Sequence, residues 1–496
     1  MIAREHKLIA ILFWSLLLAP AAGYCQLWFA TRGQAAQDDR AWGVDTDSAG
    51  NIYWSVEQKD LWPYWYYNIY LYKITPEGNQ VWQTPSWGGL FNDIAFVTKV
   101  SGSSVYLAGR IDSTANPNLG DALVVCRNAS DGNYRWHYTY DQGFGYEEID
   151  GISIQPDGIF LTGWTVGETT GFDFLVQKIS LEGQLIWSRP WDYNQLGKMD
   201  GANGNLAIDN NFIYAAGHVG RTNIASLDGD MGLACFNRSD GTLQWSTTWG
   251  GSLFDDGLGL TLGSDSMLYV VGYTASFGKG SQFYLNKFSR TGELHWSRIW
   301  GGTGAEDCRA VVAGPDSLIY AIGATSSFGH DDYDIFVLKY SPAGVLIDSL
   351  LWGGTGKETA HDAVLAGDYL YITGETWSYG KDAMTGNGHS EGLLLKVNAR
   401  TMEGPDASMS IQEVLLAEPS LRIFPDPAKS SVTIEFPDTQ NSSLTLFSLR
   451  GQPVLRQEHI SGNRLQLDVS HLPKGIYLVS LKGRKSGRLT GRLMIK

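Results

Sequence analysis

The chain has 496 residues, including 59 glycines, 18 tryptophans and 24 tyrosines, and only 18% of its residues are charged. Its net charge of −15 argues against partners that need a cationic surface, such as nucleic acids and anionic membranes. From residue 411 onward 12 basic residues outnumber 7 acidic ones, so the excess acid lies before that point. Abundant glycine and aromatic residues with few charges indicate many short strands joined by tight turns.

The first 25 residues are organised like a secretory signal peptide. Arg4 and Lys7 precede an apolar run over residues 8–22, which is shorter than the ~20 residues of a membrane-spanning helix. Small residues between Ala19 and Tyr24 suit cleavage by a signal peptidase. The sequence therefore predicts export after removal of residues 1–25, and no transmembrane helix in the mature chain.

One phrase of roughly 50 residues recurs between residues 26 and 400, and such a period predicts stacked or radially arranged units. Each copy predicts four antiparallel strands. An acidic residue opens the first strand, and a glycine-containing hairpin separates the third strand from a fourth that carries a tryptophan. Glycine supplies the positive φ that such hairpins need. The aligned tryptophans are Trp82, Trp136, Trp187, Trp245 and Trp296.

The two ends of the repeat region complement each other. The seventh copy stops at residues 393–400 without a hairpin or a tryptophan strand, whereas residues 26–33 form an orphan tryptophan strand around Trp28. We expect this N-terminal strand to pair with the last copy and close the ring. The predicted fold is all-β: a seven-bladed β-propeller over residues 26–400, closed by its N-terminal strand. Asp348 replaces the expected tryptophan in one copy and predicts a weaker contact there.

The chain changes character after residue 400. Residues 401–420 have no clear period and are predicted to form a linker. In residues 421–496, apolar and polar residues alternate between turn residues, which predicts a small antiparallel β-sandwich.

Several short motifs occur in this last part in a fixed order. They involve Pro425, Asp426, Pro427, Gly451, Leu472, Pro473, Gly475 and Tyr477. With these motifs the region resembles the C-terminal sorting domain of the type IX secretion system of Bacteroidota. The resemblance implies passage through the periplasm and across the outer membrane, with the secretion machinery as a partner, to a secreted or surface location. The repeats themselves resemble a bacterial β-propeller repeat found in secreted proteins of no assigned activity.

The acidic residues that open the first strands are the candidate metal ligands. Because first strands line the channel of a propeller, the carboxylates would ring one of its mouths and could hold Ca²⁺. The alternative is that each carboxylate caps the turn before it by accepting backbone N–H bonds. The residues in question are Asp39, Asp93, Glu148 (or Glu147), Asp200, Asp256, Asp307 and Glu358. No other cofactor is predicted.

An aromatic insertion over residues 60–70 is the candidate ligand-binding surface. Its side chains are too many for one buried face, and exposed aromatic patches mark binding surfaces. A platform for glycans is one hypothesis, and a lid packed on a neighbouring sheet is the other. The aromatic residues concerned are Trp62, Tyr64, Trp65, Tyr66 and Tyr67. Shorter loops at the same place in later copies repeat Phe277, Phe328 and Tyr379, which favours packing.

Signatures of catalysis are absent from the sequence. It contains no HExxH, no GxSxG in a suitable context and no phosphate-binding loop, so no catalytic residue is predicted. The spacing of cysteines such as Cys126 and Cys235 does not indicate a disulfide or a metal site, and they are expected to be small buried thiols. We interpret the protein as a surface binding or scaffold propeller that recognises glycans or proteins. The alternative is a hydrolase or lyase that acts on polysaccharide through channel carboxylates.

Overall fold

The computed structural model describes residues 27–33, 37–59, 66–88, 92–112, 120–143, 145–168, 171–193, 198–223, 226, 228–330, 332–380, 388–405, 408–409, 422–424, 428–448, 453–482 and 488–495. Within these residues every regular element is a β-strand except one short 3-10 helix, η1 (Pro315–Ser317). The all-β class is therefore confirmed. In the described part of the chain, no helix has the length and apolar character needed to cross a membrane.

The strands up to residue 409 form seven antiparallel sheets, which we number in chain order. Sheet 1 contains β2 (Arg40–Thr46), β3 (Ile52–Lys59), β4 (Tyr67–Ile74) and β5 (Gln80–Gln83). Sheet 2 contains β6 (Asp93–Ser101), β7 (Ser104–Asp112), β8 (Gly120–Asn128) and β9 (Tyr134–Tyr140). Sheet 3 contains β10 (Glu148–Gln155), β11 (Gly158–Gly167), β12 (Gly171–Ile179) and β13 (Leu185–Trp191). Sheet 4 contains β14 (Met199–Gly201), β15 (Ala207–Ile208), β16 (Phe212–Arg221), β17 (Asp230–Asn237) and β18 (Leu243–Trp249).

The remaining three of these sheets follow the same order, with additions at their outer edges. Sheet 5 contains β19 (Asp255–Leu262), β20 (Leu268–Thr274), β21 (Gln282–Phe288) and β22 (Leu294–Trp300). Sheet 6 contains β23 (Glu306–Ala313), β24 (Ile319–Thr325), β25 (Asp334–Tyr340), β26 (Leu346–Trp352) and β30 (Ser408–Met409). Sheet 7 contains β27 (Glu358–Ala366), β28 (Tyr369–Thr376), β29 (Glu391–Asn398) and β1 (Phe29–Arg32).

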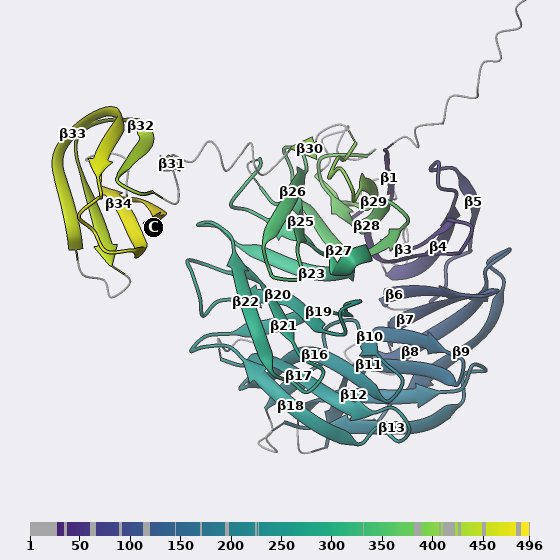
Figure 1. Cartoon of the computed structure of the whole chain (residues 1–496). Coiled ribbons are helices and arrows are strands. Elements are labelled where there is room, and N and C mark those ends of the chain that lie inside the picture. The colour runs from purple at the N-terminus through teal and green to yellow at the C-terminus, as the bar shows by residue number, and fades with distance from the viewer. Residues whose placement is uncertain are drawn as a thin grey trace, which may run out of the picture.

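The sheets are arranged around a common axis, with their first strands innermost (Figure 1). Strand β2 contacts both β6 and β27, and β23 contacts both β19 and β27, so the circuit of sheets is continuous from sheet 7 back to sheet 1. Each buried core cluster of this region draws its residues from two neighbouring sheets. A sheet therefore buries its apolar faces only against its neighbours, as expected for a repeat architecture.

The N-terminal strand closes this circuit, as the sequence predicted. Strand β1 pairs antiparallel with β29, with Phe29 opposite Leu395 and Thr31 opposite Leu393. The carbonyl of Trp28 accepts a bond from the amide of Lys396 at 2.9 Å. Sheet 7 is therefore built from both ends of the repeat region, and β1 supplies its fourth strand.

Tryptophans of the fourth strands contact the hairpin of the next sheet. A Cβ built on Gly183, in the sheet 3 hairpin, would lie 2.7 Å from Cε3 of Trp136 in sheet 2. Gly78 faces Trp28 in the same way, and Trp28 Nε1 donates to the carbonyl of Pro76 at 3.1 Å. These glycines have two physical reasons to lack a side chain, since their φ is positive and the indole ring occupies the space.

Asp348 occupies the tryptophan position of sheet 6. The contact between a tryptophan and the hairpin of the next sheet is missing there. The fourth strand of sheet 7 comes from the N-terminus, so β29 ends without a hairpin that a tryptophan at this position could contact. Residues after β29 turn back instead, and Lys339 Nζ donates to the carbonyls of Ala399 and Arg400 at 3.1 and 3.2 Å. The departure from the repeat therefore follows from how the ring closes.

The C-terminal residues form a separate sheet. It has the order β31 (Arg422–Phe424), β32 (Ser431–Ser448), β34 (Gly475–Lys482) and β35 (Arg488–Ile495), and β33 (Pro453–Asp468) pairs with β32. The first part of β32 pairs with β31 and its last part with β34. Both parts contribute to one apolar cluster, which includes Val432, Leu446, Val479 and Leu493.

We predict that Gly183→Ala destabilises the full chain by about 2–4 kcal/mol, because alanine meets both a positive φ and the Trp136 ring. Gly102→Ala is the matched control, since Gly102 has a φ of +57° and open space around its Cβ position. It should lose only about 1–2 kcal/mol. Urea unfolding measures both values, and equal losses would show that the indole contact contributes nothing.

Candidate functional site

The acidic residue that opens each first strand is buried and bonded to the backbone. The seven side chains at this place are at most 1% exposed. Asp93 accepts from the amide of Asp112 at 3.1 Å, and Glu358 accepts from the amide of Gly354 at 2.8 Å. This geometry fits the turn-capping alternative. The seven residues are Asp39, Asp93, Glu147, Asp200, Asp255, Glu306 and Glu358.

Four of the seven predicted metal ligands occupy the capping position, and the other three lie one residue after it in the chain. Glu148, Asp256 and Asp307 pair with Trp164, Tyr273 and Ala324 on the second strands, and their side chains leave the opposite face of the strand from the capping carboxylates. No three of the seven predicted carboxylates bring their oxygens within 4.8 Å of one another, and all seven are among the described residues. The seven therefore do not form one ring of ligands.

The first strands are irregular where they pass the axis. In six sheets the pairing with the second strand shifts register near the third residue after the capping carboxylate, as in a β-bulge. In sheet 4 the first strand is interrupted between β14 and β15. Side chains from these irregularities line one cavity: Trp42, Phe96, Asp150, Asn203, Leu258, Arg309 and His361.

This cavity on the axis, which we call the axial mouth, breaks the sevenfold repetition of the sequence. The capping position is always acidic, whereas the seven cavity positions hold seven different residue types. Sequence reasoning missed these residues because it followed what the copies share. The signal that could have found them is an aligned position of the repeat at which every copy has a different residue. Asp150, Arg309 and His361 occupy this position in three of the copies.

Charged and polar groups crowd the axial mouth. Arg309 Nε pairs with Asp307 Oδ2 at 2.9 Å. Burial, together with the nearby charge of Glu148, raises the pKa of Asp150 well above its ordinary range. Asp150 Oδ2 and Asn205 Oδ1 are buried atoms without a hydrogen-bond partner in the described structure. Such groups are unfavourable in a cavity that serves only packing.

His361 is held neutral in the same cavity. Its ring stacks on Trp42 with centroids 4.2 Å apart and planes at 17°. Its Nδ1 donates to the carbonyl of Ala41 at 2.9 Å. Burial and the charge of Arg309 lower the pKa of His361 to about 4. At neutral pH the imidazole is therefore an uncharged aromatic surface, and its Nε2 lies 3.3 Å from the Thr359 hydroxyl.

Second strands add a rim of polar and aromatic side chains next to the axial mouth. Trp42 Nε1 donates to Glu57 at 2.8 Å, and Trp164 Nε1 donates to Glu148 at 2.5 Å. Arg110 pairs with Glu148 at 3.3 Å. Arg40 and Lys357 both lie 3.4 Å from Glu375, and the Asn203 amide donates to Asp256 at 3.1 Å.

Tyr67, in the described part of the aromatic insertion, lies beside this rim. Trp62, Tyr64 and Trp65 lie outside the described residues, whereas Tyr66 and Tyr67 are described. The ring of Tyr67 lies 5.3 Å from Lys59 Nζ and 6.0 Å from the guanidinium of Arg40. Since Arg40 belongs to the rim, the insertion joins sheet 1 at the same end of the ring as the axial mouth.

The repeated aromatic loops are packing elements, as the sequence predicted. Phe277, Phe328 and Tyr379 lie 5.2, 4.9 and 5.1 Å from the ring centroids of the tryptophans that precede the Gly-Gly turns, which are Trp249, Trp300 and Trp352. The cysteines at 126, 235 and 308 are buried free thiols, also as expected.

The predicted sorting motifs are described only in part. Pro425, Asp426, Pro427 and Gly451 lie outside the described residues. Leu472, Pro473, Gly475 and Tyr477 form the turn that leads into β34 and the beginning of that strand. The amide of Leu472 donates to the carbonyl of Val469 at 3.0 Å, and the Tyr477 hydroxyl donates to the carbonyl of Pro473 at 2.6 Å. The motif is therefore a self-bonded turn that orients the next strand.

Comparison with known proteins identifies the C-terminal part. A family profile described as the secretion system C-terminal sorting domain matches residues 422–496. This supports the type IX sorting domain inferred from the sequence, and such a tail implies a secreted protein. No curated protein matches the chain.

Solved structures similar to this chain include β-propellers. One is a virginiamycin B lyase from Staphylococcus aureus, crystallised with quinupristin (12% identity, covering 75% of this chain and 99% of that chain, TM-score 0.44). Another is the β-propeller domain of the Trilobed protease from Pyrococcus furiosus (9% identity, covering 75% of this chain and 99% of that chain, TM-score 0.42). Likenesses this distant transfer no activity to this chain.

The pH dependence of stability tests the electrostatics of the rim. Burial raises the pKa of Glu57 from its ordinary value of 4.5 to about 7. The folded state therefore binds this proton more tightly than the unfolded chain, and the stability that it contributes below pH 4.5 is lost as the pH rises through 7. Glu57→Gln can still accept from Trp42. It should be more stable than the parent at pH 8, by up to about 3 kcal/mol, and nearly equal to it at pH 4.5.

Urea unfolding at the two pH values measures this difference. Glu77→Gln, at an exposed hairpin position, controls for the substitution itself. A stability difference between Glu57→Gln and the parent that is the same at pH 4.5 and pH 8 would contradict the prediction.

Proposed function

We propose that this protein is a secreted or cell-surface binding propeller whose axial mouth holds a polyhydroxylated ligand, such as a glycan. In this proposal sheets 1–7 are the seven blades of the propeller. The C-terminal sheet is the sorting sandwich that directs the chain through the periplasm and the type IX secretion machinery to the outer surface. The signal peptide at residues 1–25 belongs to the same proposal.

One observation carries the binding proposal: the seven copies place seven different residue types where the repeat meets the axis. Packing between sheets does not need charged or titratable groups at the axis, so Asp150, Arg309 and His361 there favour a role in binding. Buried carboxylate oxygens without partners accept hydrogen bonds from hydroxyl groups, as at Asp150. Partly exposed rings of the rim, such as Trp164 and Tyr67, offer flat faces for sugar rings.

A glycan panel tests this proposal. We expect the parent to bind one glycan class, and both Asp150→Ala and Trp164→Ala to weaken that binding at least tenfold, which corresponds to about 1.4 kcal/mol. Asp131→Ala, at an exposed hairpin turn of sheet 2, is the control. Trp62→Ala and Trp65→Ala measure whether the insertion contributes. Unchanged glycan binding by the two axial variants would discard the axial mouth as the site, and capture of a protein instead of a glycan would replace the ligand class.

A second candidate function is polysaccharide hydrolysis or cleavage by a lyase. The observation that favours it is the raised pKa of Asp150, because a carboxyl that holds its proton more tightly than an ordinary aspartate suits a general acid beside a second carboxyl group, Glu148. Reducing or unsaturated ends released by the parent and lost in Asp150→Asn would establish catalysis. Binding without any release of ends would leave the binding function alone.

Removal of the sorting tail tests the export part of the proposal. A chain that ends at residue 420 should fold its seven sheets with unchanged thermal stability, because the apolar cluster of the C-terminal sheet contains no residue of sheets 1–7. We expect it to remain in the periplasm, whereas the full chain reaches the cell surface or the medium. Fractionation and immunoblotting measure the distribution. Equal amounts outside the cell would contradict the role of the tail.

A further inference from the structure

The junctions between neighbouring sheets share one arrangement of polar groups around a glycine. The third strand of one sheet begins with a polar residue, and this residue faces the capping carboxylate of the next sheet. A Trp-Gly-Gly turn follows the fourth strand, and its first glycine lies between these two side chains. A Cβ on Gly250 would clash with the carboxylates of Asp230 and Asp255, and one on Gly353 would clash with Asp334. The turn therefore uses glycine where two polar side chains leave no room for a third.

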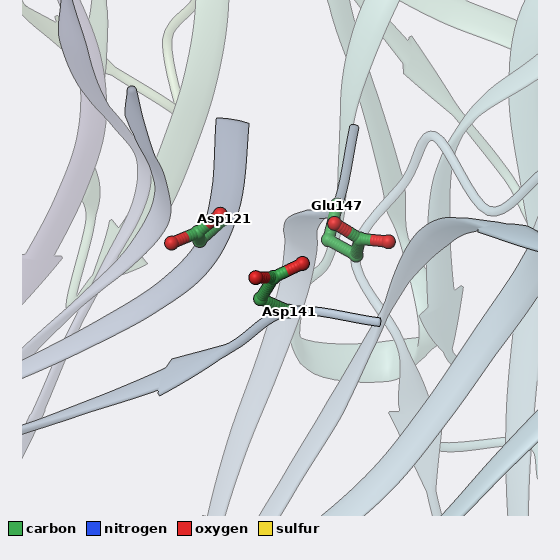
Figure 2. A group of neighbouring side chains, drawn as sticks. All are labelled: Asp121, Asp141 and Glu147. Atoms are coloured by element: carbon green, nitrogen blue, oxygen red, sulfur yellow. The ribbon is translucent and has the colours of Figure 1, made fainter. Parts of the chain in front are cut away.

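The junction between sheets 3 and 4 departs from this arrangement, with Asp192 at the glycine position, and so does the junction between sheets 2 and 3. Its turn reads Tyr140-Asp141-Gln142, so an aspartate occupies the glycine position. Asp121 at the start of β8 and the capping residue Glu147 flank it, and Figure 2 shows the three carboxylates grouped together. One oxygen from each residue lies within 4.8 Å of the others.

No lysine, arginine or histidine forms an ion pair with this group in the described part of the chain. The ion pairs of the described residues include none made by Asp121, Asp141 or Glu147. Burial and neighbouring carboxylates, Asp141 among them, raise the pKa of both Asp121 and Glu147. Three like charges so close together are unfavourable unless a positive charge or protons compensate them.

Glu147 supplies an independent indication of a ligand. Its side chain is fully buried. The Thr165 hydroxyl donates to Oε1 at 3.1 Å, whereas Oε2 is buried and without a hydrogen-bond partner in the described structure. An unsatisfied carboxylate oxygen in a buried place is costly, and a bound cation would satisfy it.

We propose that Asp121, Asp141 and Glu147 form a Ca²⁺ site that joins sheets 2 and 3. Calcium takes oxygen ligands at about 2.3–2.6 Å, so ligand oxygens that share one ion lie within about 5 Å of each other. Three carboxylates are hard ligands of irregular geometry, which suits Ca²⁺ better than Mg²⁺. An affinity of about 0.1–1 mM is typical of extracellular calcium modules. The site is separate from the axial mouth, and it does not depend on the function proposed there.

Calcium titration of the chelator-treated full chain tests the site. We expect a Kd of about 0.1–1 mM by isothermal titration calorimetry, and 10 mM CaCl₂ should raise Tm by about 1–3 °C. The same concentration of MgCl₂ should give a smaller shift. A parent chain without calcium-dependent heat or Tm shift would overturn the proposal.

The decisive variant is Asp141→Gly, which introduces the glycine that Gly250, Gly301 and Gly353 supply at the same place in other turns and is therefore expected to fold. Without calcium it should be at least as stable as the parent, because one of three crowded charges is removed. Its calcium affinity should fall at least tenfold. Asp192→Gly is the matched control, since Asp192 follows Trp191 at the equivalent turn of the next junction but does not belong to the group within 4.8 Å. A calcium response retained in Asp141→Gly, or lost equally in Asp192→Gly, would contradict the assignment.

Discussion

Contact between a tryptophan of one sheet and the hairpin glycine of the next is the interaction on which the ring depends. A four-stranded sheet cannot bury its own apolar faces, so each sheet is stable only against two neighbours. The indole ring covers the hairpin backbone, and its N–H can bond a hairpin carbonyl, as Trp28 does with Pro76. A uniform contact of this kind fixes the spacing between sheets and so allows the circuit to close.

Closure explains the places where the repeat fails. Sheet 7 takes its outer strand from the N-terminus, and therefore has no hairpin between β29 and that strand. Asp348 occupies the tryptophan position of sheet 6 because its neighbour offers no hairpin glycine. Lys339 instead bonds the carbonyls at the end of β29. A single topological feature thus accounts for an irregular residue, a missing turn and an orphan strand.

Carboxylates have three different roles in this scaffold, which their surroundings decide. At the start of the first strands they cap turns and are bonded to backbone amides, as Glu358 is. One residue further along, those such as Glu148 leave the opposite face of the strand and pair with other groups of the rim. At the junction of sheets 2 and 3, Asp141 adds a third carboxylate to a pair. The residue type is the same in all three roles, and only its neighbours differ.

The sequence by itself determined the strand order, the glycine hairpins, the closing strand at Trp28 and the sorting tail, because each of these repeats or follows a local pattern. Only the tertiary structure determined which residues line the axial mouth and which carboxylates meet at the junction of sheets 2 and 3. The capping register was ambiguous between Glu147 and Glu148 because two consecutive residues are acidic, and only the fold shows which of them is bonded to the turn. Asp121, Asp141 and Glu147 lie on separate segments of two sheets, and their proximity follows from sheet packing, which no periodicity in the sequence encodes.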